Sequence, residues 1–405
     1  MTDNAKSPIL SKNVSSSIGL EPNLRFSEFD ALWNKIPFRE LVSEYNNKTR
    51  VEDEDVLLSS AIDGVFLNSE LFGHQRGSSN IGYKKISMYT LILSTQNLHL
   101  GNANVNTRFE HGMVSPAYKT YEIRNCNKQL FSLWIKSEKA KRFFYNATTV
   151  GASQCRRNVE WDSLYEQEMI LPSLAEQQKI ADFLSLVDQR IEKQRQLVEV
   201  LKRYKRGLFL LLFDGKQQNN ILSQIIEYGK AGGTPTSTNK NYYSGTIPFL
   251  SISDMTAQGK FLRNTEKHIS ELGLKNSTAW LVPANSLIIS MYASYGLVSI
   301  NTIPITTSQA MFSIIPKDET DTEYLYYYLS YLSTTGYYDK MVSTGTQANL
   351  NAEKVKNIPI YFPSKEERTK IKVILKTFDE MEDAENRKLE TLLDIKSGLL
   401  QQMFI

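Results

Sequence analysis

Residues 171–213 read LPSLAEQQKIADFLSLVDQRIEKQRQLVEVLKRYKRGLFLLLF. Pro172 and Ser173 form a favourable helix start, and Glu176 stands where its carboxylate can reach back to the backbone N–H of Ser173 in a capping box. From Ser173 to Phe213 the sequence contains no Gly or Pro except Gly207. At about 1.5 Å per residue it predicts one helix of roughly 60 Å, which is longer than a compact domain needs.

Apolar residues recur in this helix every seven positions in two rows, with the three-four spacing of a coiled-coil seam. The rows consist of Ile180, Val187, Gln194, Leu201 and Leu208, and of Leu184, Ile191, Val198, Lys205 and Leu212. A single helix of this kind is most often a partner-binding or dimerising coiled coil, because amphipathic helices are mostly packing elements.

The same stretch occurs a second time, 191 positions later, where residues 362–404 read FPSKEERTKIKVILKTFDEMEDAENRKLETLLDIKSGLLQQMF. Its seam rows consist of Ile371, Phe378, Glu385, Leu392 and Leu399, and of Leu375, Glu382, Leu389, Lys396 and Met403. Polar residues interrupt both copies at matching heptads. Two copies at the ends of equal halves indicate that the helices set the architecture of the chain.

Composition restricts the class of protein. A chain of 405 residues is too long for one core, and its 41% hydrophobic and 22% charged residues are those of an ordinary soluble protein. A net charge of +3 does not by itself indicate nucleic-acid binding. Cys126 and Cys155 form no C-x-x-C pair, and neither an apolar signal region nor a membrane-length apolar run is present. We expect no metal site, no disulfide, no membrane association and a location in the cytoplasm.

The chain is predicted to alternate globular segments with the two helices. The predicted segments are a flexible N-terminal tail at 1–24, a first mixed α/β domain at 25–170, a central helix at 171–213, a second such domain at 214–361 and a distal helix at 362–405. The first domain is expected to contain strands within 87–94 and 112–123 and a helix at 129–145. The second is expected to contain strands at 247–252, 286–291 and 311–315 and an aromatic-rich helix at 323–332.

The simplest way for one chain to bury both apolar stripes is to pack the two helices together. An antiparallel pair would place the two domains at opposite ends of a rod. The charges favour this orientation, because the middle of the first helix is basic (Arg190, Lys193 and Arg195) and the middle of the second is acidic (Asp379, Glu380, Glu382, Asp383 and Glu385). The predicted fold class is α+β, with two α/β domains alternating with two long helices that pair as an antiparallel coiled coil.

Sequence motifs for catalysis are missing. The chain has no G-x-x-x-x-G-K-[ST], G-x-G-x-x-G, H-E-x-x-H or G-x-S-x-G motif, no Pro-Pro dipeptide and no Glu-x-Lys. The four histidines, His74, His99, His111 and His268, are scattered and are interpreted as surface or structural residues. No catalytic residue is predicted. Two classes of function stay open at this point: a self-contained DNA modification enzyme and a non-DNA coiled-coil adaptor.

The run from Leu171 to Asp188 resembles the central helical region of the DNA specificity subunit of type I restriction-modification systems. Residues 362–404 resemble its distal counterpart, with a departure at Arg368, where Gln177 stands in the central copy. The opening Gly232-Gly-Thr-Pro235, followed by Ile247-Pro-Phe-Leu250, is similar to the start of many target recognition domains of that family.

The resemblance implies two target recognition domains that each read one part of a split site in double-stranded DNA, with the helices as a spacer of fixed length. It implies two methyltransferase subunits that supply S-adenosylmethionine and adenine methylation, and two restriction subunits with ATP-dependent motor and nuclease activity that use Mg²⁺. This chain would carry no cofactor and no catalytic residue of its own.

Four polar loops are the predicted DNA-contacting segments: 74–85, 148–158, 229–243 and 343–351. They combine Arg and Lys for phosphates or guanine, Gln and Asn for adenine, and glycines that allow close approach. Ordinary solvated turns are an equally good interpretation of any single loop. The predicted DNA-binding residues are Arg76, Tyr83, Lys84, Lys85, Arg156, Arg157, Lys230, Thr234, Lys240, Tyr243, Gln347 and Asn349.

Overall fold

The structure is a computed structural model and describes residues 10–12, 21–72, 79–150, 157–292, 294–342 and 350–405. It divides into two compact units, the first comprising residues 1–195 and 388–405 and the second comprising residues 196–387. Each unit therefore contains one globular domain and a part of both long helices. Over the described ranges, no helix is long and apolar enough to cross a membrane.

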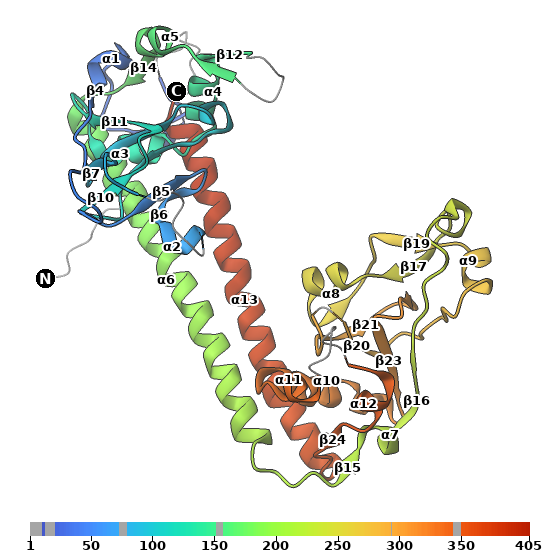
Figure 1. The fold of residues 1–405 in the computed structure, drawn as a ribbon. Coiled ribbons are helices and arrows are strands. Elements are labelled where there is room, and N and C mark those ends of the chain that lie inside the picture. The colour runs from blue at the N-terminus through green and yellow to red at the C-terminus, as the bar shows by residue number, and fades with distance from the viewer. Residues whose placement is uncertain (1–9, 13–20, 73–78, 151–156, 293, 343–349) are drawn as a thin grey trace, which may run out of the picture. The chain divides into compact units, whose positions relative to one another are not determined.

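The two long helices are α6 (Leu174–Phe213) and α13 (Lys365–Met403), as the repeated sequence predicts (Figure 1). Each follows a serine whose Oγ accepts a backbone hydrogen bond: Ser173 from Glu176 N at 3.4 Å and Ser364 from Glu367 N at 3.3 Å. The predicted reciprocal bond from Glu176 to the N–H of Ser173 is wrong. The Glu176 carboxylate instead accepts both Nε and Nη2 of Arg25, at 2.7 and 2.8 Å, because this side chain is drawn into the core.

The helices pair as an antiparallel coiled coil, and contacts inside each unit show the direction. In the first unit Asp188 Oδ1 lies 2.5 Å from Lys396 Nζ, and in the second Lys205 Nζ lies 2.6 Å from Asp379 Oδ1. The later residue of α6 thus meets the earlier residue of α13. Asp188 and Asp379 are equivalent in the two sequence copies, as are Lys205 and Lys396. The two ion pairs are therefore the same pair generated twice by the repeat.

The predicted seam residues lie on the inner faces of the two helices. Those that are buried are Ile180, Leu184, Ile191, Val198, Leu201, Ile371 and Leu375. Those that are partly buried are Val187, Phe378, Leu389 and Leu392. Two of the polar interruptions of the seam face each other, because Lys205 Nζ lies 3.5 Å from Glu382 Oε2.

The predicted pairing of the basic and acidic middles of the helices is wrong in register. The acidic stretch of α13 meets Lys205, which lies further along α6 than the basic cluster, while Arg195 contacts Glu192 of its own helix at 4.0 Å. The apolar seam sets the register, since burying it contributes more than exposed ion pairs of ~0.2–1 kcal/mol each. This register brings Lys205, a seam position, opposite Asp379 and Glu382.

The globular part of the first unit is built around a four-stranded antiparallel sheet of order β4-β11-β8-β9. A separate strand pair, β3 with β14, leads directly into α6. The elements of this unit are β1 (Leu10–Lys12), β2 (Leu24–Phe26), β3 (Asn34–Pro37), α1 (Phe38–Leu41), β4 (Val42–Tyr45), β5 (Leu58–Ala61), β6 (Gly64–Leu67), α2 (Asn68–Leu71), β7 (Lys84–Ser87), β8 (Leu91–Ser94), a 3-10 turn (Leu98–Leu100), β9 (Ala103–Val105), β10 (His111–Val114), β11 (Tyr118–Ile123), α3 (Lys128–Trp134), α4 (Glu138–Asn146), β12 (Thr148–Val150), β13 (Arg157–Val159), α5 (Trp161–Glu166) and β14 (Glu168–Leu171).

Three predicted elements of this unit are each two elements in the structure. The run 87–94 is divided between β7 and β8 by a turn in which Tyr89 has a φ of 64°, and the run 112–123 is divided between β10 and β11. The predicted helix 129–145 breaks into α3 and α4, because Ser137 caps a new helix by accepting a hydrogen bond from Ala140 N at 3.1 Å. Apolar periodicity does not report such short turns.

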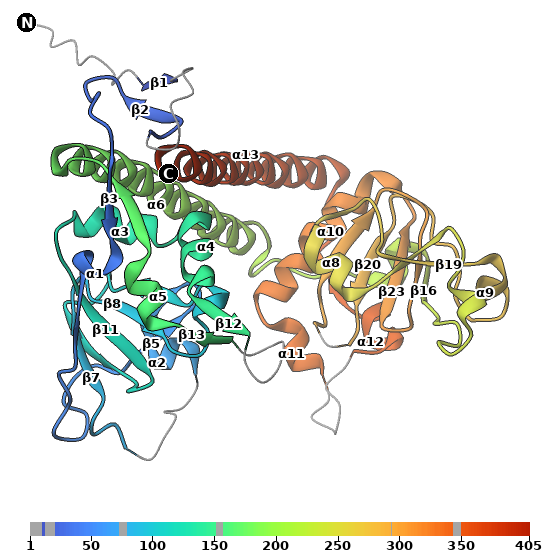
Figure 2. The ribbon, with the colours of Figure 1, turned by 90° about the horizontal axis from the view of Figure 1, so that it is seen from above.

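The core of the first unit joins three layers. Buried residues of β8 and β11, such as Leu91 and Tyr121, contact the faces of α3 and α4, and these helices in turn cover the start of α6 (Figure 2). Phe131 and Leu184 belong to this continuous cluster, as does Phe404 just after the end of α13. The first domain is therefore anchored to both long helices by one apolar core.

The second unit repeats this plan, with a sheet of order β16-β23-β20-β21-β18. The pair β15–β24 precedes α13 as β3–β14 precedes α6. The elements are β15 (Asn220–Ile221), α7 (Leu222–Ile225), β16 (Ile226–Ala231), a 3-10 turn (Lys240–Tyr242), β17 (Ile247–Leu250), α8 (Ile252–Gln258), β18 (Phe261–Leu262), β19 (Lys267–Ile269), α9 (Glu271–Lys275), β20 (Leu287–Ser290), β21 (Val298–Asn301), β22 (Thr306–Thr307), β23 (Met311–Pro316), a 3-10 turn (Glu319–Asp321), α10 (Thr322–Thr334), α11 (Tyr337–Met341), α12 (Ala352–Lys356) and β24 (Pro359–Ile360).

Tyrosines of α10 attach the second domain to the coiled coil. The ring of Phe213 packs edge-on against Tyr328 with centroids 5.3 Å apart and lies 5.3 Å from the ring of Tyr331. Burial raises the pKa of Tyr331 to about 12, so its hydroxyl stays protonated and donates to Asp214 at 3.2 Å. The aromatic helix predicted from sequence is thus the element that joins this domain to α6.

Candidate nucleic-acid interface

The structure divides the predicted DNA-binding residues into three groups. Arg76, Arg156, Gln347 and Asn349 lie outside the described residues. A second group is engaged inside its own domain, and a third is exposed on the second domain. The location of each remaining residue follows.

Lys84 and Lys85 begin β7, and their ammonium groups are engaged within the first domain. Lys84 is 8% exposed and donates from Nζ to the carbonyl of Tyr118 at 2.7 Å, and desolvation lowers its pKa. Lys85 forms an ion pair with Glu54, and the hydrogen bond from Lys85 holds the pKa of that carboxyl below its ordinary value. Both side chains brace the fold in this structure, so a DNA contact by either would require it to leave its present partner.

Arg157 braces a hairpin. It begins β13, which pairs with β12, and its guanidinium donates from Nε to Thr148 Oγ1 at 2.7 Å and from Nη2 to Thr148 O at 2.6 Å. The same group lies over the ring of Tyr145 at 4.3 Å. The hairpin carries the loop that connects β12 to β13, and Arg157 fixes its base.

Tyr83 lies at a depression of about 600 Å³ on the first domain. The depression is lined by Leu57, Leu58, Ser59, Ser60, Ala61, Ile62, Asp63, Asn68, Leu71, Phe72, Tyr83, Asn97, Asn102, Ser115 and Tyr118. Asn97 is exposed there, and an amide of this kind can donate to and accept from adenine. Sequence reasoning missed Asn97 because it lies outside the Gly/Arg-rich loops that were singled out.

The loop after β16 is held rigidly in the second domain. A Cβ on Gly232 would lie 2.1 Å from the carbonyl oxygen of Thr307, and one on Gly233 would lie 2.2 Å from Thr278 Oγ1, so only glycine fits at these two positions. Tyr243 donates from its hydroxyl to the carbonyl of Pro235 at 2.7 Å. The Gly-Gly-Thr-Pro opening is therefore a backbone requirement of the loop.

The rigid loop presents two exposed cations. Lys230 on β16 and Lys240 in the following turn are both exposed, and neither ammonium group has a hydrogen-bond or ion-pair partner among the described residues. Thr234 is also exposed and donates to the amide oxygen of Gln309. Unlike Lys84 and Lys85, these lysines are available to phosphate without breaking an internal contact.

Thr234 and Tyr243 meet at the rim of an open depression of about 730 Å³. It is lined by Thr234, Ser237, Tyr243, Ser244, Gly245, Phe249, Glu266, Lys267 and His268. Lys267 and His268 come from β19 and are exposed. In the sequence His268 is one of four scattered histidines, because its approach to the loop depends on the pairing of β19 with β17. A hydroxyl, an ammonium and an imidazole on one rim can contact phosphates and base edges.

Within the described ranges, no cluster of three or more His, Cys, Asp or Glu side chains has the proximity that a metal site needs.

Comparison with known proteins identifies the class. Residues 38–203 and 218–393 each match the family described as the type I restriction modification DNA specificity domain. The two matches cover most of the chain and coincide with its two repeats. The chain therefore belongs to this family and contains two specificity domains.

Curated relatives carry the same description. The chain is 35% identical over 180 residues to the type I restriction enzyme HindI specificity subunit of Haemophilus influenzae, covering 43% of this chain and 38% of that protein. It is 30% identical over 187 residues to the MjaIX specificity subunit of Methanocaldococcus jannaschii, covering 45% and 43%. These matches thus span less than half of either relative. A putative MjaX specificity subunit of the same archaeon is 24% identical over 377 residues, covering 86% and 80%.

Solved structures share the fold along nearly the whole chain. The S subunit of a type I restriction-modification system from M. genitalium superposes with a TM-score of 0.52 at 16% identity, covering 95% of this chain and 99% of that one. A chain from a structure of the assembly and conformational transition of the type I system gives a TM-score of 0.56 at 15% identity, with 92% and 97% coverage. At these identities the likeness concerns the fold.

Proposed function

We propose that this chain reads a bipartite double-stranded DNA site, with one half-site recognised by each specificity domain and the spacing set by the antiparallel helices. The observation that carries the proposal is the repeat itself. Two domains whose sheets share a four-strand order, to which the second adds β18 at one edge, are each joined through a strand pair to one of two long helices, and these helices pair with each other. We infer that the helices serve to hold the two reading surfaces apart.

The exposed lysines of the second domain support DNA as the ligand. Lys267 lines the depression together with Thr234 and His268, and Lys230 and Lys240 are exposed on the segment of chain that contains Thr234. Phosphate contacts by lysines position a protein on the duplex, while hydroxyl and imidazole groups can read base edges. The first domain presents amides, notably Asn97, at its own depression, so the two domains are suited to different sequences.

The outer faces of the long helices support the methyltransferase subunits as partners. Leu197, Tyr204 and Leu211 recur every seven residues on α6 and are 42%, 64% and 74% exposed. On α13 the equivalent heptad row contains Met381 and Ile395, which are 46% and 49% exposed, with Lys388 between them. Exposed apolar rows at heptad spacing are suited to receive a further helix.

In the assembly that we propose, two methyltransferase subunits join this chain, bind S-adenosylmethionine and methylate adenine. Two restriction subunits use ATP and Mg²⁺ for translocation and cleavage. The specificity chain selects the sequence for both reactions.

The test lengthens the spacer without touching either domain. Seven residues inserted after Arg195 in α6 and seven after Arg387 in α13, both at the boundary between the units, extend each helix by about 10 Å and keep the seam in phase. The assembled methyltransferase should then methylate a site with the same two half-sites and a longer non-specific spacer, measured by sequencing methylated adenines.

The matched control inserts the heptad into one helix alone. The seam residues of α6 and α13 then no longer face their partners on both sides of the insertion, and methylation should be abolished. An unchanged spacer in the doubly extended protein would contradict the proposal that the helices set the distance.

A further inference from the structure

The fourth residue of each long helix occupies the same place in the two units. Gln177 donates from its backbone N–H to Ser173 O at 2.9 Å, and Arg368 donates likewise to Ser364 O at 3.0 Å. Each side chain also donates to the carbonyl of the preceding proline, Gln177 Nε2 at 2.9 Å and Arg368 Nη1 at 2.6 Å. The position is therefore conserved in geometry while its chemistry changes from neutral amide to cation.

The domain residue that meets this position changes with it. After the sheet strand β11 the chain reaches Asn127, the N-cap of α3, and after the equivalent strand β23 it reaches Asp321, the N-cap of α10. In the first unit the contact is neutral: Asn127 N donates to Gln177 Oε1 at 2.8 Å, and Asn127 Nδ2 donates to Gln178 Oε1 at 2.7 Å. We call the Asn127–Gln177 contact the first junction.

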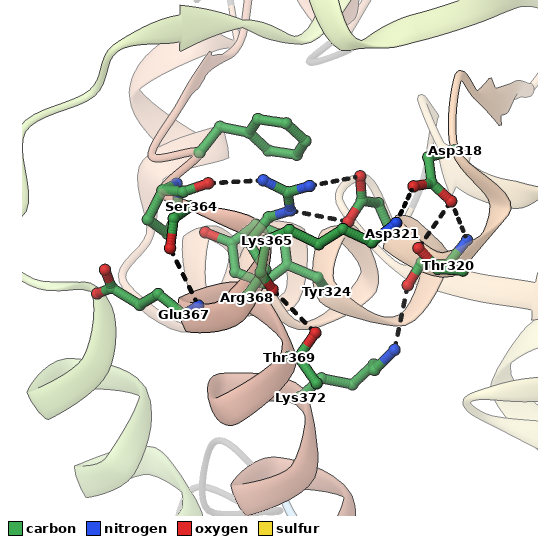
Figure 3. Close-up of polar contacts among 12 residues, drawn as sticks. Asp318, Thr320, Asp321, Tyr324, Ser364, Lys365, Glu367, Arg368, Thr369 and Lys372 are labelled. Carbon is green, nitrogen blue, oxygen red and sulfur yellow. Dashed lines mark hydrogen bonds and ion pairs between the residues drawn. The ribbon is translucent and has the colours of Figure 1, made fainter.

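In the second unit the side chain of the cap residue takes the place of the backbone N–H of Asn127, and the contact is ionic, as Figure 3 shows. Arg368 donates from Nε and Nη2 to the two carboxylate oxygens of Asp321, at 2.8 and 3.1 Å, and its guanidinium lies 3.9 Å from the centre of the Phe362 ring. The side chains are 11% and 9% exposed. We call the Asp321–Arg368 contact the second junction.

Two further cations of α13 bind the same loop. Lys365 Nζ lies 2.8 Å from Asp318 Oδ2, and Lys372 Nζ donates to the carbonyl of Thr320 at 3.2 Å (Figure 3). The positions of α6 equivalent to these two lysines hold Leu174 and Ala181. The loop of the first domain, Arg124-Asn-Cys-Asn127, contains no acidic residue. Each helix start is thus matched in charge to the loop that rests on it.

We propose that the charges at the two junctions determine which specificity domain each long helix holds stably. A domain is held stably when the charge of its cap residue matches the fourth residue of the helix. A domain with the acidic cap, moved onto α6, would set a poorly solvated carboxylate against the Gln177 amide with no cation. The converse exchange would leave Arg368 without its anion. Removing one partner of such a pair is costly because the other charge stays desolvated. This rule concerns domain attachment and goes beyond what the domains bind.

A double-mutant cycle in the full chain tests the second junction. Arg368→Gln and Asp321→Asn should each lower the unfolding midpoint by roughly 5 to 10 °C, while the double variant, in which the second junction is neutral, should lose much less than the sum. Lys365→Gln with Asp318→Asn is the control cycle, since those side chains are 61% and 40% exposed and should show almost no coupling. Additive losses in the Arg368–Asp321 cycle would overturn the proposal.

Moving the second domain onto α6 tests this charge matching directly. Residues 222–358 replace residues 38–167, so that the strand pair β3–β14 and the Arg25 contact of Glu176 are retained. This chain should unfold at a lower temperature than the same chain carrying Gln177→Arg, which restores a cation opposite the transplanted acidic cap. Equal midpoints with and without Gln177→Arg would show that the fourth helix position does not select the domain.

Discussion

Asp188 and Asp379 are the same residue in the two copies of the repeat, yet their surroundings differ. Asp188 forms an ion pair with Lys396, and the two side chains are 38% and 27% exposed. Asp379 is 14% exposed and contacts Lys205, Lys260 at 2.9 Å and the hydroxyl of Tyr327 at 2.6 Å. The repeat therefore preserves the helix pairing, while the domain that packs against each helix determines whether the charge is buried.

At the helix starts the first unit has the more deeply buried acidic residue. Glu176 is 1% exposed and accepts hydrogen bonds from Arg25 and, at 3.3 Å, from Trp33 Nε1. The equivalent Glu367 is partly exposed and accepts the hydroxyl of Tyr361 at 2.7 Å. The first unit thus buries the carboxylate of Glu176 at the start of α6, and the second buries the carboxylate of Asp379 in the middle of α13. Equivalent positions in a repeat need not contribute equally to stability.

The largest expected effect compares the two glutamates. Glu176→Gln should lower the free energy of unfolding by roughly 3–5 kcal/mol, because the buried Arg25 guanidinium loses the carboxylate that accepts from both Nε and Nη2 and retains Glu21 at 3.9 Å. Glu367→Gln should cost about 1 kcal/mol or less, since an amide oxygen can still accept from Tyr361. Urea unfolding of both full-length variants measures the difference. Equal losses would contradict the larger contribution to stability that we assign to Glu176.

The next effect compares the two aspartates. Asp379→Asn should cost about 2 kcal/mol at pH 7, because it weakens charge-assisted bonds to Lys205, Lys260 and Tyr327. Asp188→Asn is the matched control and should cost at most about 1 kcal/mol, as exposed pairs do.

The Asp379 effect should depend on pH. The neighbouring lysines hold the pKa of Asp379 below its ordinary value against the opposing effect of desolvation. Its stabilisation is therefore present above the unfolded pKa of about 3.9 and is lost as pH falls through the lower folded pKa. Unfolding measured at pH 7 and pH 3 should show the wild-type advantage over Asp379→Asn shrinking in acid. An advantage that grows in acid would refute the assignment.

The smallest effects compare the lysines of the two domains. Lys240→Ala should leave stability within about 0.5 kcal/mol but weaken DNA binding to all sequences and reduce the salt slope by about 1, because Lys240 is exposed and unengaged. Lys84→Ala should instead cost about 1 kcal/mol of stability through the lost bond to Tyr118 O. The measurements are thermal unfolding and binding at two salt concentrations. An unchanged salt slope in Lys240→Ala would remove that turn from the interface.

Much of the candidate site was beyond sequence reasoning for an identifiable reason. Residue type marked Lys84, Lys85 and Arg157 as DNA contacts, but their partners Tyr118, Glu54 and Thr148 come from other parts of the chain. Lys267 and His268 line the depression near Thr234 because β19 pairs with β17, and the local sequence does not predict this pairing.

The sequence by itself determined the architecture of this protein: two long helices, their antiparallel seam and a domain before each, because these follow from heptad spacing and from a repeat that any fold must respect. The tertiary structure alone decided the register of the charges, the splitting of predicted strands by turns such as the one at Tyr89, and the burial of Glu176 and Asp379. These depend on which residues distant in the sequence approach each other, and so on desolvation and packing that local patterns do not encode.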